Sequence, residues 1–323
     1  MIKIDAASLT EGINYEEFLG EYYDGLGAGA STYHGGEPDE FFGSEYYVSG
    51  PEVSFDYGDT TDQLVLLEGT EIAYDFIHYG SSFGHGISGE VDKITFGLAD
   101  EGTGTEGSDP NGLVTGLDTG LVISGLSIAA EPGSGNDSSN PVYDLYDSAR
   151  NAGVEDGAIE NLYDIFSAEG QKVLGSAYAD VFLGTDHADY IRGFDGDDVL
   201  GGGDGNDAIK GGLGDDTIIG GSGFDKLFGG EGADVFVFSG ASDSPVGTPD
   251  KVMDFARGVD SFDLAGFGDL TEVAAFTGAA GEVILADDGG RFGSLQVDVS
   301  GNGEADFEVA IRFADAVDTD LFV

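Results

Sequence analysis

The sequence predicts an α+β N-terminal domain, with a curved antiparallel sheet and helices on one face, followed by a parallel β-roll and a β-rich C-terminal module. Apolar residues recur at helical spacing near both ends of the first half, and short alternating segments lie between them. A strict nine-residue repeat fills residues 175–237. We therefore expect domains at 1–172, 173–238 and 239–323.

The first domain is expected to begin and end with helices. Residues 14–27 place aromatic and aliphatic side chains on one helical face. Residues 140–153 carry a proline in the first turn and end at a glycine, and residues 155–170 carry a second inward apolar stripe. Between the helices we expect short strands at 45–48, 52–57, 63–67, 71–78, 91–97 and 120–128.

The composition of the 323 residues excludes several functions. A formal charge of −52 and a pI near 4.1 would repel nucleic acids and anionic membranes, and they favour bound cations. There is no cysteine, so neither a disulfide framework nor a thiolate metal site is possible. Because no apolar run is long enough to cross a membrane, we expect no membrane insertion. The stretch MIKIDAASLTEG lacks the apolar core of a secretory signal.

The repeat divides residues 175–237 into seven nonapeptides without a gap. Position one is always glycine, which allows close backbone approach. Position eight is always apolar and is expected to point inward, so that stacked repeats bury a continuous core. Position six is always aspartate: Asp180, Asp189, Asp198, Asp207, Asp216, Asp225 and Asp234.

Stacking aligns these aspartates, and the aligned carboxylates should repel one another unless a cation neutralises them. Ca²⁺ takes six to eight oxygen ligands, which neighbouring turns can supply as carboxylates and carbonyls. We expect calcium to be part of the fold, with the metal-free segment largely disordered. The first two repeats carry Tyr178 and His187 instead of glycine at position four, which indicates a cap with weak or absent calcium. The expected calcium ligands are Asp189, Asp198, Asp207, Asp216, Asp225 and Asp234.

The repeat resembles the RTX nonapeptide G-G-x-G-x-D-x-U-x, and residues 250–267 and 295–313 resemble the C-terminal module of serralysin-type secreted proteins. The final DLFV resembles the uncleaved signal of a type I (ABC) exporter. The resemblance covers residues 173–323. It implies an extracellular protein that leaves through such an exporter and folds when it meets calcium outside the cell.

Enzyme motifs in residues 1–172 are weak. None of the four histidines belongs to an H-E-x-x-H zinc motif, which argues against a protease. The stretch GSSFG at 80–84 matches a nucleophile elbow with Ser82, but the residues after it do not read as the required helix. Such a match is also expected by chance in a chain this rich in glycine and serine. We expect no enzyme, with a secreted serine esterase kept as an alternative.

The order of elements in residues 1–172 resembles the HasA-type hemophores, which capture heme outside the cell. A helix leads into a long glycine-rich loop that holds His34. A strand with Tyr74 then leads to a turn with His85 and the run Gly89, Asp92, Phe96, Gly97, and the helix pair 140–170 closes the domain.

The resemblance implies that ferric heme b is clamped between a loop with His34 and a loop with Tyr74, whose phenolate His85 supports. Ferric iron stabilises a phenolate, and tyrosine is a known axial heme ligand. His78 competes with His85 for the supporting role, because it shares a strand face with Tyr74. The implied partners are an outer-membrane heme receptor and host heme proteins such as hemoglobin. A calcium-dependent adhesion or surface-layer protein without heme remains an alternative.

Overall fold

The computed structural model describes residues 1–34, 39–41, 44–46, 49–57, 62–74, 87–99, 114, 117–132, 134–155, 157–287 and 291–314. The chain divides into two compact units. Unit 1 comprises Met1–Ser8 and Glu17–Ala168, and unit 2 comprises Leu9–Glu16 and Glu169–Val323. The sequence placed domain boundaries after residues 172 and 238, whereas this division has its main boundary after 168 and no boundary at 238.

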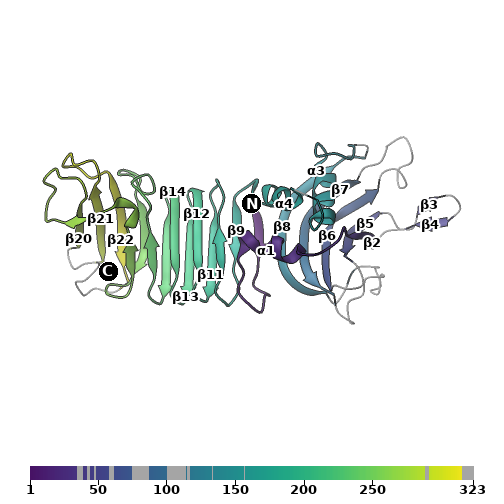
Figure 1. Ribbon diagram of the computed structural model, residues 1–323, viewed down its shortest axis with the longest axis horizontal. Helices are drawn as coiled ribbons and strands as arrows, with labels where there is room; N and C mark the ends of the chain where they lie inside the picture. Colours follow the sequence, from purple (N-terminus) through teal and green to yellow (C-terminus); the bar gives the residue numbers. More distant parts are fainter. Residues whose placement is uncertain are drawn as a thin grey trace. The chain divides into compact units, whose positions relative to one another are not determined.

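Unit 1 contains an antiparallel sheet (Figure 1). Its strands follow the order β1-β8-β7-β6-β5-β2. Their bounds are β1 Ile2–Asp5, β2 Ala30–His34, β5 Ser49–Asp56, β6 Gln63–Tyr74, β7 Ile87–Leu98 and β8 Asp118–Ala130. Strands β3 (Asp39–Phe41) and β4 (Ser44–Tyr46) form a separate two-stranded hairpin.

The helices of unit 1 pack on one face of this sheet. The register pairs Phe55 of β5 with Val65 of β6 and Val65 with Phe96 of β7, so the two phenylalanines share a face. Helix α1 (Tyr15–Tyr23) packs Tyr22 against Phe96, and helix α3 (Pro141–Asn151) packs Tyr146 against Phe55. Helix α4 (Ala158–Ser167) lies against α3. These contacts give the predicted arrangement of helices on one face.

Local sequence explains how α3 begins. The side chain of Asn140 accepts hydrogen bonds from the backbone N–H groups of Val142 and Tyr143, and Pro141 fills the first helical position, where no N–H is needed. The same side chain donates to the carbonyl of Ile87 over 2.8 Å. Asn140 therefore caps the helix and ties it to the start of β7.

Two expectations about strands differ from the structure. Segments 63–67 and 71–78 were expected as separate strands, but β6 runs continuously from Gln63 to Tyr74 and absorbs the interruption as bulges near Gly69 and Ala73. Residues 75–78 lie outside the described residues. His34, expected in a loop, is the last residue of β2, which pairs with β5.

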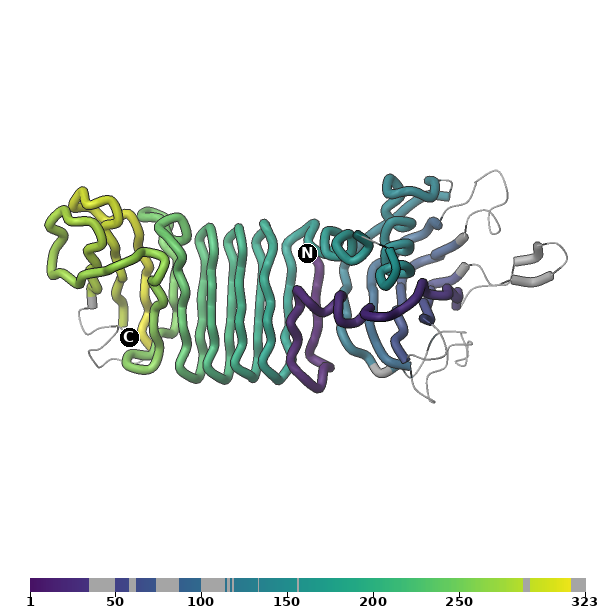
Figure 2. Tube along the Cα trace, viewed as in Figure 1, coloured from purple at the N-terminus to yellow at the C-terminus, as the bar shows by residue number. Residues whose placement is uncertain are grey.

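Unit 2 contains the predicted parallel roll, whose turns stack regularly in Figure 2. Odd and even strands alternate between two parallel sheets, so each coil contributes one strand to each sheet. The first sheet holds β9 Gln171–Leu174, β11 Tyr190–Asp195, β13 Ala208–Leu213, β15 Lys226–Glu231 and β17 Asp250–Phe255. The second holds β10 Val181–Leu183, β12 Val199–Gly205, β14 Thr217–Gly223, β16 Val235–Val237 and β18 Ser261–Asp263.

The position-eight side chains form the core between the two sheets, as predicted. All seven are fully buried: Phe182, Ile191, Leu200, Ile209, Ile218, Leu227 and Phe236. Because each of the first five is in register with its equivalent two repeats later, the core is a stack of like side chains.

The C-terminal module continues the first sheet of the roll. Strand β22 (Phe307–Phe313) pairs in parallel with β17, and β21 (Phe292–Asp298) and β20 (Glu282–Asp287) then add in antiparallel fashion. A 3₁₀ turn at Ala265–Phe267 and the short strand β19 (Thr271–Glu272) complete the module. Phenylalanines fill the junction, with Phe255 and Phe262 stacked at 4.7 Å. No helix in the described part of the chain is long and apolar enough to span a membrane.

Candidate functional site

The repeat aspartates form two hydrogen-bonded columns along the roll. The backbone N–H of each donates to Oδ1 of the aspartate one full coil later, for example from Asp180 to Asp198 over 2.8 Å and from Asp198 to Asp216 over 2.9 Å. One column runs 180, 198, 216, 234, 260 and the other runs 189, 207, 225, 250. Every member of these columns is at most 5% exposed.

The repeats are of two kinds, which differ in whether the second carboxylate oxygen, Oδ2, has a hydrogen-bond partner. In six of these aspartates Oδ2 is buried and has no hydrogen-bond partner: Asp198, Asp207, Asp216, Asp225, Asp234 and Asp250. A buried acceptor without a partner costs roughly 1–3 kcal/mol, and more if it is charged. Six such atoms in regular rows therefore indicate a site that a cation would stabilise.

The first two repeats satisfy Oδ2 with the protein itself. Ser176 and Thr185 replace glycine at position two, and their backbone N–H groups donate to Oδ2 of Asp180 and Asp189 over 2.6 and 2.7 Å. Their hydroxyls add further hydrogen bonds to the same carboxylates. Oδ1 of Asp189 also accepts from the N–H of Gln171.

Asp189, expected among the calcium ligands, thus has both oxygens occupied by protein donors in this structure. It differs in this respect from the five other aspartates of the predicted set, each of which has a free Oδ2. His187, interpreted as a turn residue, is exposed and donates its backbone N–H to the Thr185 hydroxyl.

Position-one glycines make room for Oδ2. A Cβ on Gly193, Gly211 or Gly229 would collide with Oδ2 of the aspartate five residues later. The same space beside Gly211 is bounded by the carbonyl oxygen of Gly229, at 2.7 Å from where the Cβ would lie. Gly193 and Gly211 therefore each keep open a small cradle lined by a carboxylate oxygen and a carbonyl oxygen from the next coil.

The donor set fits Ca²⁺. Both kinds of oxygen are ligands that calcium prefers, and carbonyls from neighbouring turns can complete a coordination shell of six to eight. Within the described residues no three Asp, Glu or His side chains converge on one point, so side chains alone do not form a metal cage. A calcium ion here would need the backbone carbonyls of the glycine-rich turns.

The electrostatics of the columns favour a bound cation. Burial, with a smaller contribution from neighbouring aspartates, raises the pKa of Asp198, Asp207 and Asp216 to about 7. Burial also raises the pKa of Asp250 to about 8. The ionised column is therefore costly without a bound cation.

Asp250 and Asp260 extend the columns and were missed by the sequence reasoning. The N–H groups of Asp225 and Asp234 donate to their Oδ1 atoms, as in the regular repeats. Both lie beyond the nine-residue period, but each keeps an aspartate two positions before a buried apolar residue, Val252 and Phe262. This three-residue pattern could have identified both aspartates from the sequence.

The second candidate site lies in unit 1, where the structure describes only part of the predicted set. Tyr74 is the last residue of β6 and its backbone is in register with Ile87 of β7. Its side chain, and all of His78, Ser82 and His85, lie outside the described residues. His34 is described and buried, with 3% of its surface exposed.

His34 is held by a serine. Its Nε2 lies 2.8 Å from Oγ of Ser54 on the neighbouring strand β5. The register pairs Tyr33 with Val53, which lies on the helix-covered face, so His34 and Ser54 point to the opposite face. Burial lowers the pKa of His34, so the imidazole is neutral at neutral pH, and the neutral imidazole is the form that binds metals.

Comparisons with known proteins concern mainly unit 2. The family model described as "Peptidase M10 serralysin C terminal" matches residues 191–323. Metalloprotease AprA of Pseudomonas entomophila (strain L48) is 45% identical over 96 residues, which cover 27% of this chain and 20% of that protein. Serralysin A of Dickeya chrysanthemi is 38% identical over 80 residues, covering 24% and 17%.

The chain thus matches only about a fifth of the length of these curated relatives. The family match covers residues 191–323 and does not extend to unit 1. Among solved structures, the holo hemophore HasA from Yersinia pestis aligns with a TM-score of 0.38 at 16% identity, over 52% of this chain and 89% of that chain. A TM-score of this size does not establish a shared fold.

Proposed function

We propose that the chain is a secreted hemophore in which unit 1 captures ferric heme b and unit 2 is a calcium-dependent module for type I (ABC) export. The serralysin-type match over residues 191–323 supports the export role. The observation that carries the calcium dependence is the set of six buried Oδ2 atoms without a partner.

Calcium would act in unit 2 as a folding ligand. Without it, rows of buried carboxylates with raised pKa values oppose the packed roll. With it, the binding free energy becomes folding free energy, because the unfolded chain presents no such cradle. Calcium is scarce inside cells and plentiful outside, so the module would pass the exporter unfolded and fold in the extracellular medium.

Strand direction supports a heme clamp in unit 1. Strands β2 and β6 each pair antiparallel with β5, so they run parallel to one another (Figure 1). The C-terminal ends of both strands therefore face the same way along the sheet. His34 ends β2 and Tyr74 ends β6. One strand lies between them, and His34 is in register with Glu52 of β5 whereas Ala73, the neighbour of Tyr74, is in register with Ser49, so the two strand ends are roughly 15 Å apart. The chain segments that follow both residues therefore start on the same side of unit 1.

The proposed chemistry is binding and delivery, not catalysis. Tyr74 would bind ferric iron as a phenolate, with His85 accepting its hydrogen bond or proton and His78 as the alternative support. His34 would offer a neutral imidazole from the other loop, which requires its Nε2 to leave Ser54. The proposed partners are an outer-membrane heme receptor and host heme proteins such as hemoglobin.

A hemin titration of the full chain in calcium tests the heme proposal. We expect a saturable Soret band with ferric, tyrosinate-type features. Tyr74→Ala should weaken binding more than His78→Ala, which serves as the matched control within the same segment. Weakening by His78→Ala but not by His85→Ala would assign the supporting role to His78.

Two other outcomes favour the alternatives. If the wild-type chain shows no saturable heme binding while calcium still folds unit 2, the calcium-dependent adhesion or surface-layer function takes its place. If the chain hydrolyses ester substrates and Ser82→Ala abolishes the turnover, the chain is a secreted esterase.

A further inference from the structure

Basic side chains gather on one face of unit 2. Six strands that follow one another in the first sheet each place one lysine or arginine on its outer side, and each of the six is exposed. We call this set the basic face: Lys172 on β9, Arg192 on β11, Lys210 on β13, Lys226 on β15, Lys251 on β17 and Arg312 on β22.

The register makes the basic face continuous. Position-eight residues such as Ile209 and Leu227 point into the core, so their chain neighbours at positions seven and nine point outward. Lys226 pairs with Lys251 across β15 and β17, and Arg192 pairs with Lys210 across β11 and β13. The two pairs are offset by two residues along the strands, because Lys226 pairs with Ala208 and Lys210 pairs with Phe228. Neighbouring strands are about 4.8 Å apart, so the six cations form a staggered stripe that crosses the strands.

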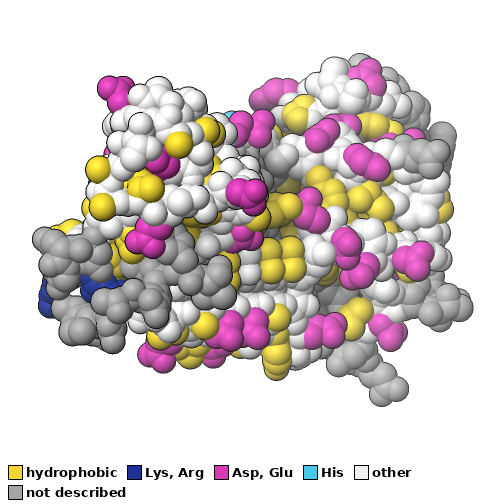
Figure 3. Space-filling model, turned by 60° about the vertical axis from the view of Figure 1, so that its left-hand side comes forward, with side chains coloured by type: hydrophobic (Ala, Val, Ile, Leu, Met, Phe, Trp, Pro, Cys, Tyr) yellow, Lys and Arg dark blue, Asp and Glu magenta, His cyan; other side chains and the backbone are white. Residues whose placement is uncertain are grey.

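The charge of the chain makes this stripe exceptional. The whole sequence has 11 lysines and arginines against 63 acidic residues, and six of those 11 lie on the basic face. In the view of Figure 3, acidic side chains are scattered over the surface, while lysine and arginine show only at one edge. Random placement would surround each cation with carboxylates.

None of these six cations forms an ion pair with another residue that the structure describes. Among the described residues, ion pairs join Lys3 to Asp5 and Lys93 to Glu68, and none involves the basic face. Asp254 is a half-buried carboxylate whose pKa is raised by burial and lowered by the charges of Lys210 and Arg312. Its Oδ1 already accepts a hydrogen bond from the N–H of Gly229.

Aromatic rings lie among the cations instead. The guanidinium of Arg192 lies 4.0 Å from the centroid of Phe194, and Nζ of Lys210 lies 5.3 Å from that of Phe228. Nζ of Lys251 lies 4.7 Å from the centroid of Phe224. Such contacts hold the long side chains against the sheet and leave their charge toward solvent.

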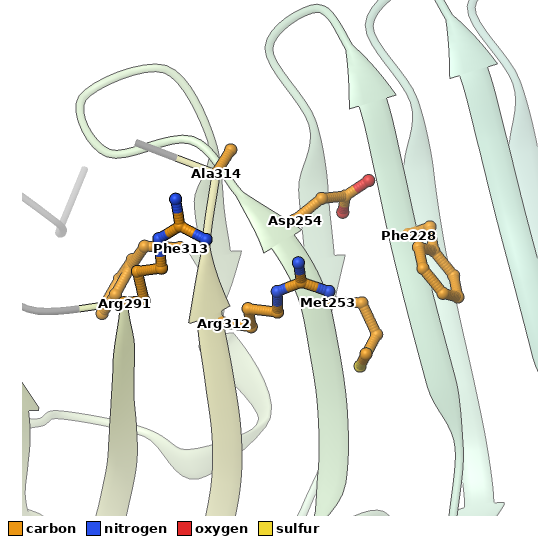
Figure 4. Close-up of a pocket in the computed structure, with 7 residues that line it drawn as sticks. All are labelled: Phe228, Met253, Asp254, Arg291, Arg312, Phe313 and Ala314. Atoms are coloured by element: carbon orange, nitrogen blue, oxygen red, sulfur yellow. The ribbon is translucent and has the colours of Figure 1, made fainter. Parts of the chain in front are cut away.

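One end of the basic face carries a second arginine. Arg291 and Arg312 line a depression of about 230 Å³ together with Asp254, Phe228 and Met253 (Figure 4). Two guanidinium groups over an apolar floor suit a carboxylate attached to a ring with an apolar side. A ligand that follows the stripe would end at this depression.

We propose that the basic face binds an extended anionic polysaccharide of the polyuronate class, which lies across the strands along the axis of the roll. A polyuronate carries one carboxylate per sugar, so its charges repeat at a spacing of the same order as the strands. Its rings offer apolar sides to Tyr190 and Phe228, which lie between the cations. The inference does not depend on heme capture by unit 1.

A nucleic acid fits the face less well. Double-stranded DNA carries one charge per about 1.7 Å of its length, several times denser than one cation per strand. Its surplus charge would lie against an acidic surface. At physiological salt the Debye length is about 8 Å, so a thin, sparsely charged polymer on the face senses the six cations while distant carboxylates are screened.

The test uses the full, calcium-loaded chain and a fluorescently labelled oligogalacturonate of about six sugars, a length that matches six strands. Fluorescence anisotropy should show saturable binding that weakens as sodium chloride rises. The variant Lys210→Gln/Lys226→Gln should weaken binding about tenfold or more. The matched control Lys3→Gln/Lys93→Gln removes the same charge from unit 1 and should leave binding unchanged.

Three results would overturn the proposal. They are equal binding by the two double variants, equal binding of a neutral dextran oligomer, and tighter binding of a DNA oligonucleotide than of the uronate. Because all the substituted side chains are exposed or partly exposed, calcium-induced circular dichroism should be the same in both variants, which separates loss of binding from loss of folding.

Discussion

The backbone N–H of Ser176 donates to Oδ2 of Asp180 over 2.6 Å, at the oxygen that has no partner in the later repeats. Thr185 does the same for Asp189. In both cases a hydroxyl residue with an ordinary backbone conformation replaces the glycine whose positive φ characterises the later turns, such as Gly203 with φ 93° and Gly221 with φ 91°. The roll therefore begins with two repeats whose carboxylates are satisfied without metal and continues with repeats whose carboxylates are not.

The first prediction compares two aspartates at equivalent positions. Asp216→Asn should lower calcium affinity at least about tenfold, because even residues outside the ligand shell of a metal commonly contribute that much. Asp189→Asn should leave calcium stoichiometry and affinity nearly unchanged, because its carboxylate is already satisfied by protein donors. Isothermal titration of both variants measures the difference, and an equal loss of calcium in the two would contradict the division of the repeats.

The second prediction concerns the cradle glycines. Gly211→Ala places a Cβ against Oδ2 of Asp216 and should destabilise the roll by about 1–3 kcal/mol, as overpacking does. Gly240→Ala is the control, because nothing lies within 4 Å of its added Cβ. The measurement is the calcium midpoint of the circular dichroism signal. A Gly211→Ala midpoint equal to that of the control would show that the cradle is not needed.

The nine-residue period was sufficient to predict the roll, since it fixes which side chain is buried and which aspartate meets its neighbour. It could not reveal that Asp189 is satisfied by Gln171 and Thr185, because that depends on the local turn conformation. The sequence period did not predict Asp250 and Asp260, because the intervening loops break it. Strand pairing nevertheless aligns these two residues with Asp225 and Asp234.

The strands of unit 1 were less predictable than its helices. Residues 27–36 are rich in glycine and read locally as a loop, yet pairing with β5 draws Ala30–His34 into a strand. Gly69 reads as the end of a strand, but it is a bulge at which a Cβ would collide with the carbonyl of Glu90 on β7. Both outcomes depend on partners far away in the sequence.

The third prediction is that the calcium-free roll is more stable in acid than at alkaline pH. Burial raises the pKa of six column aspartates from an ordinary 3.8, to about 6 for Asp225 and Asp260, about 7 for Asp198, Asp207 and Asp216, and about 8 for Asp250. The folded state therefore binds more protons than the unfolded chain over this range, and its stability falls as the pH rises through the raised values.

Calcium competes for the same oxygens, so its binding should release protons and tighten as the pH rises from about 6 to about 8. Titrations in two buffers with different ionisation enthalpies would count the released protons. Calcium binding with no proton release at pH 6 would contradict the raised pKa values.

The last prediction tests whether His34 reaches the heme through Nε2. That atom lies 2.8 Å from Oγ of Ser54, and this contact must break before Nε2 can bind iron. A neutral hydrogen bond contributes about 0.5–1.5 kcal/mol, so Ser54→Ala should tighten heme binding by roughly two- to tenfold.

In a His34→Ala background, Ser54→Ala should have no such effect, which makes the double-mutant cycle the control. The same change in heme affinity in both backgrounds would mean that Ser54 acts independently of His34. Tyr74 would then be the ligand to rely on, and the His34–Ser54 pair would serve only to join β2 to β5.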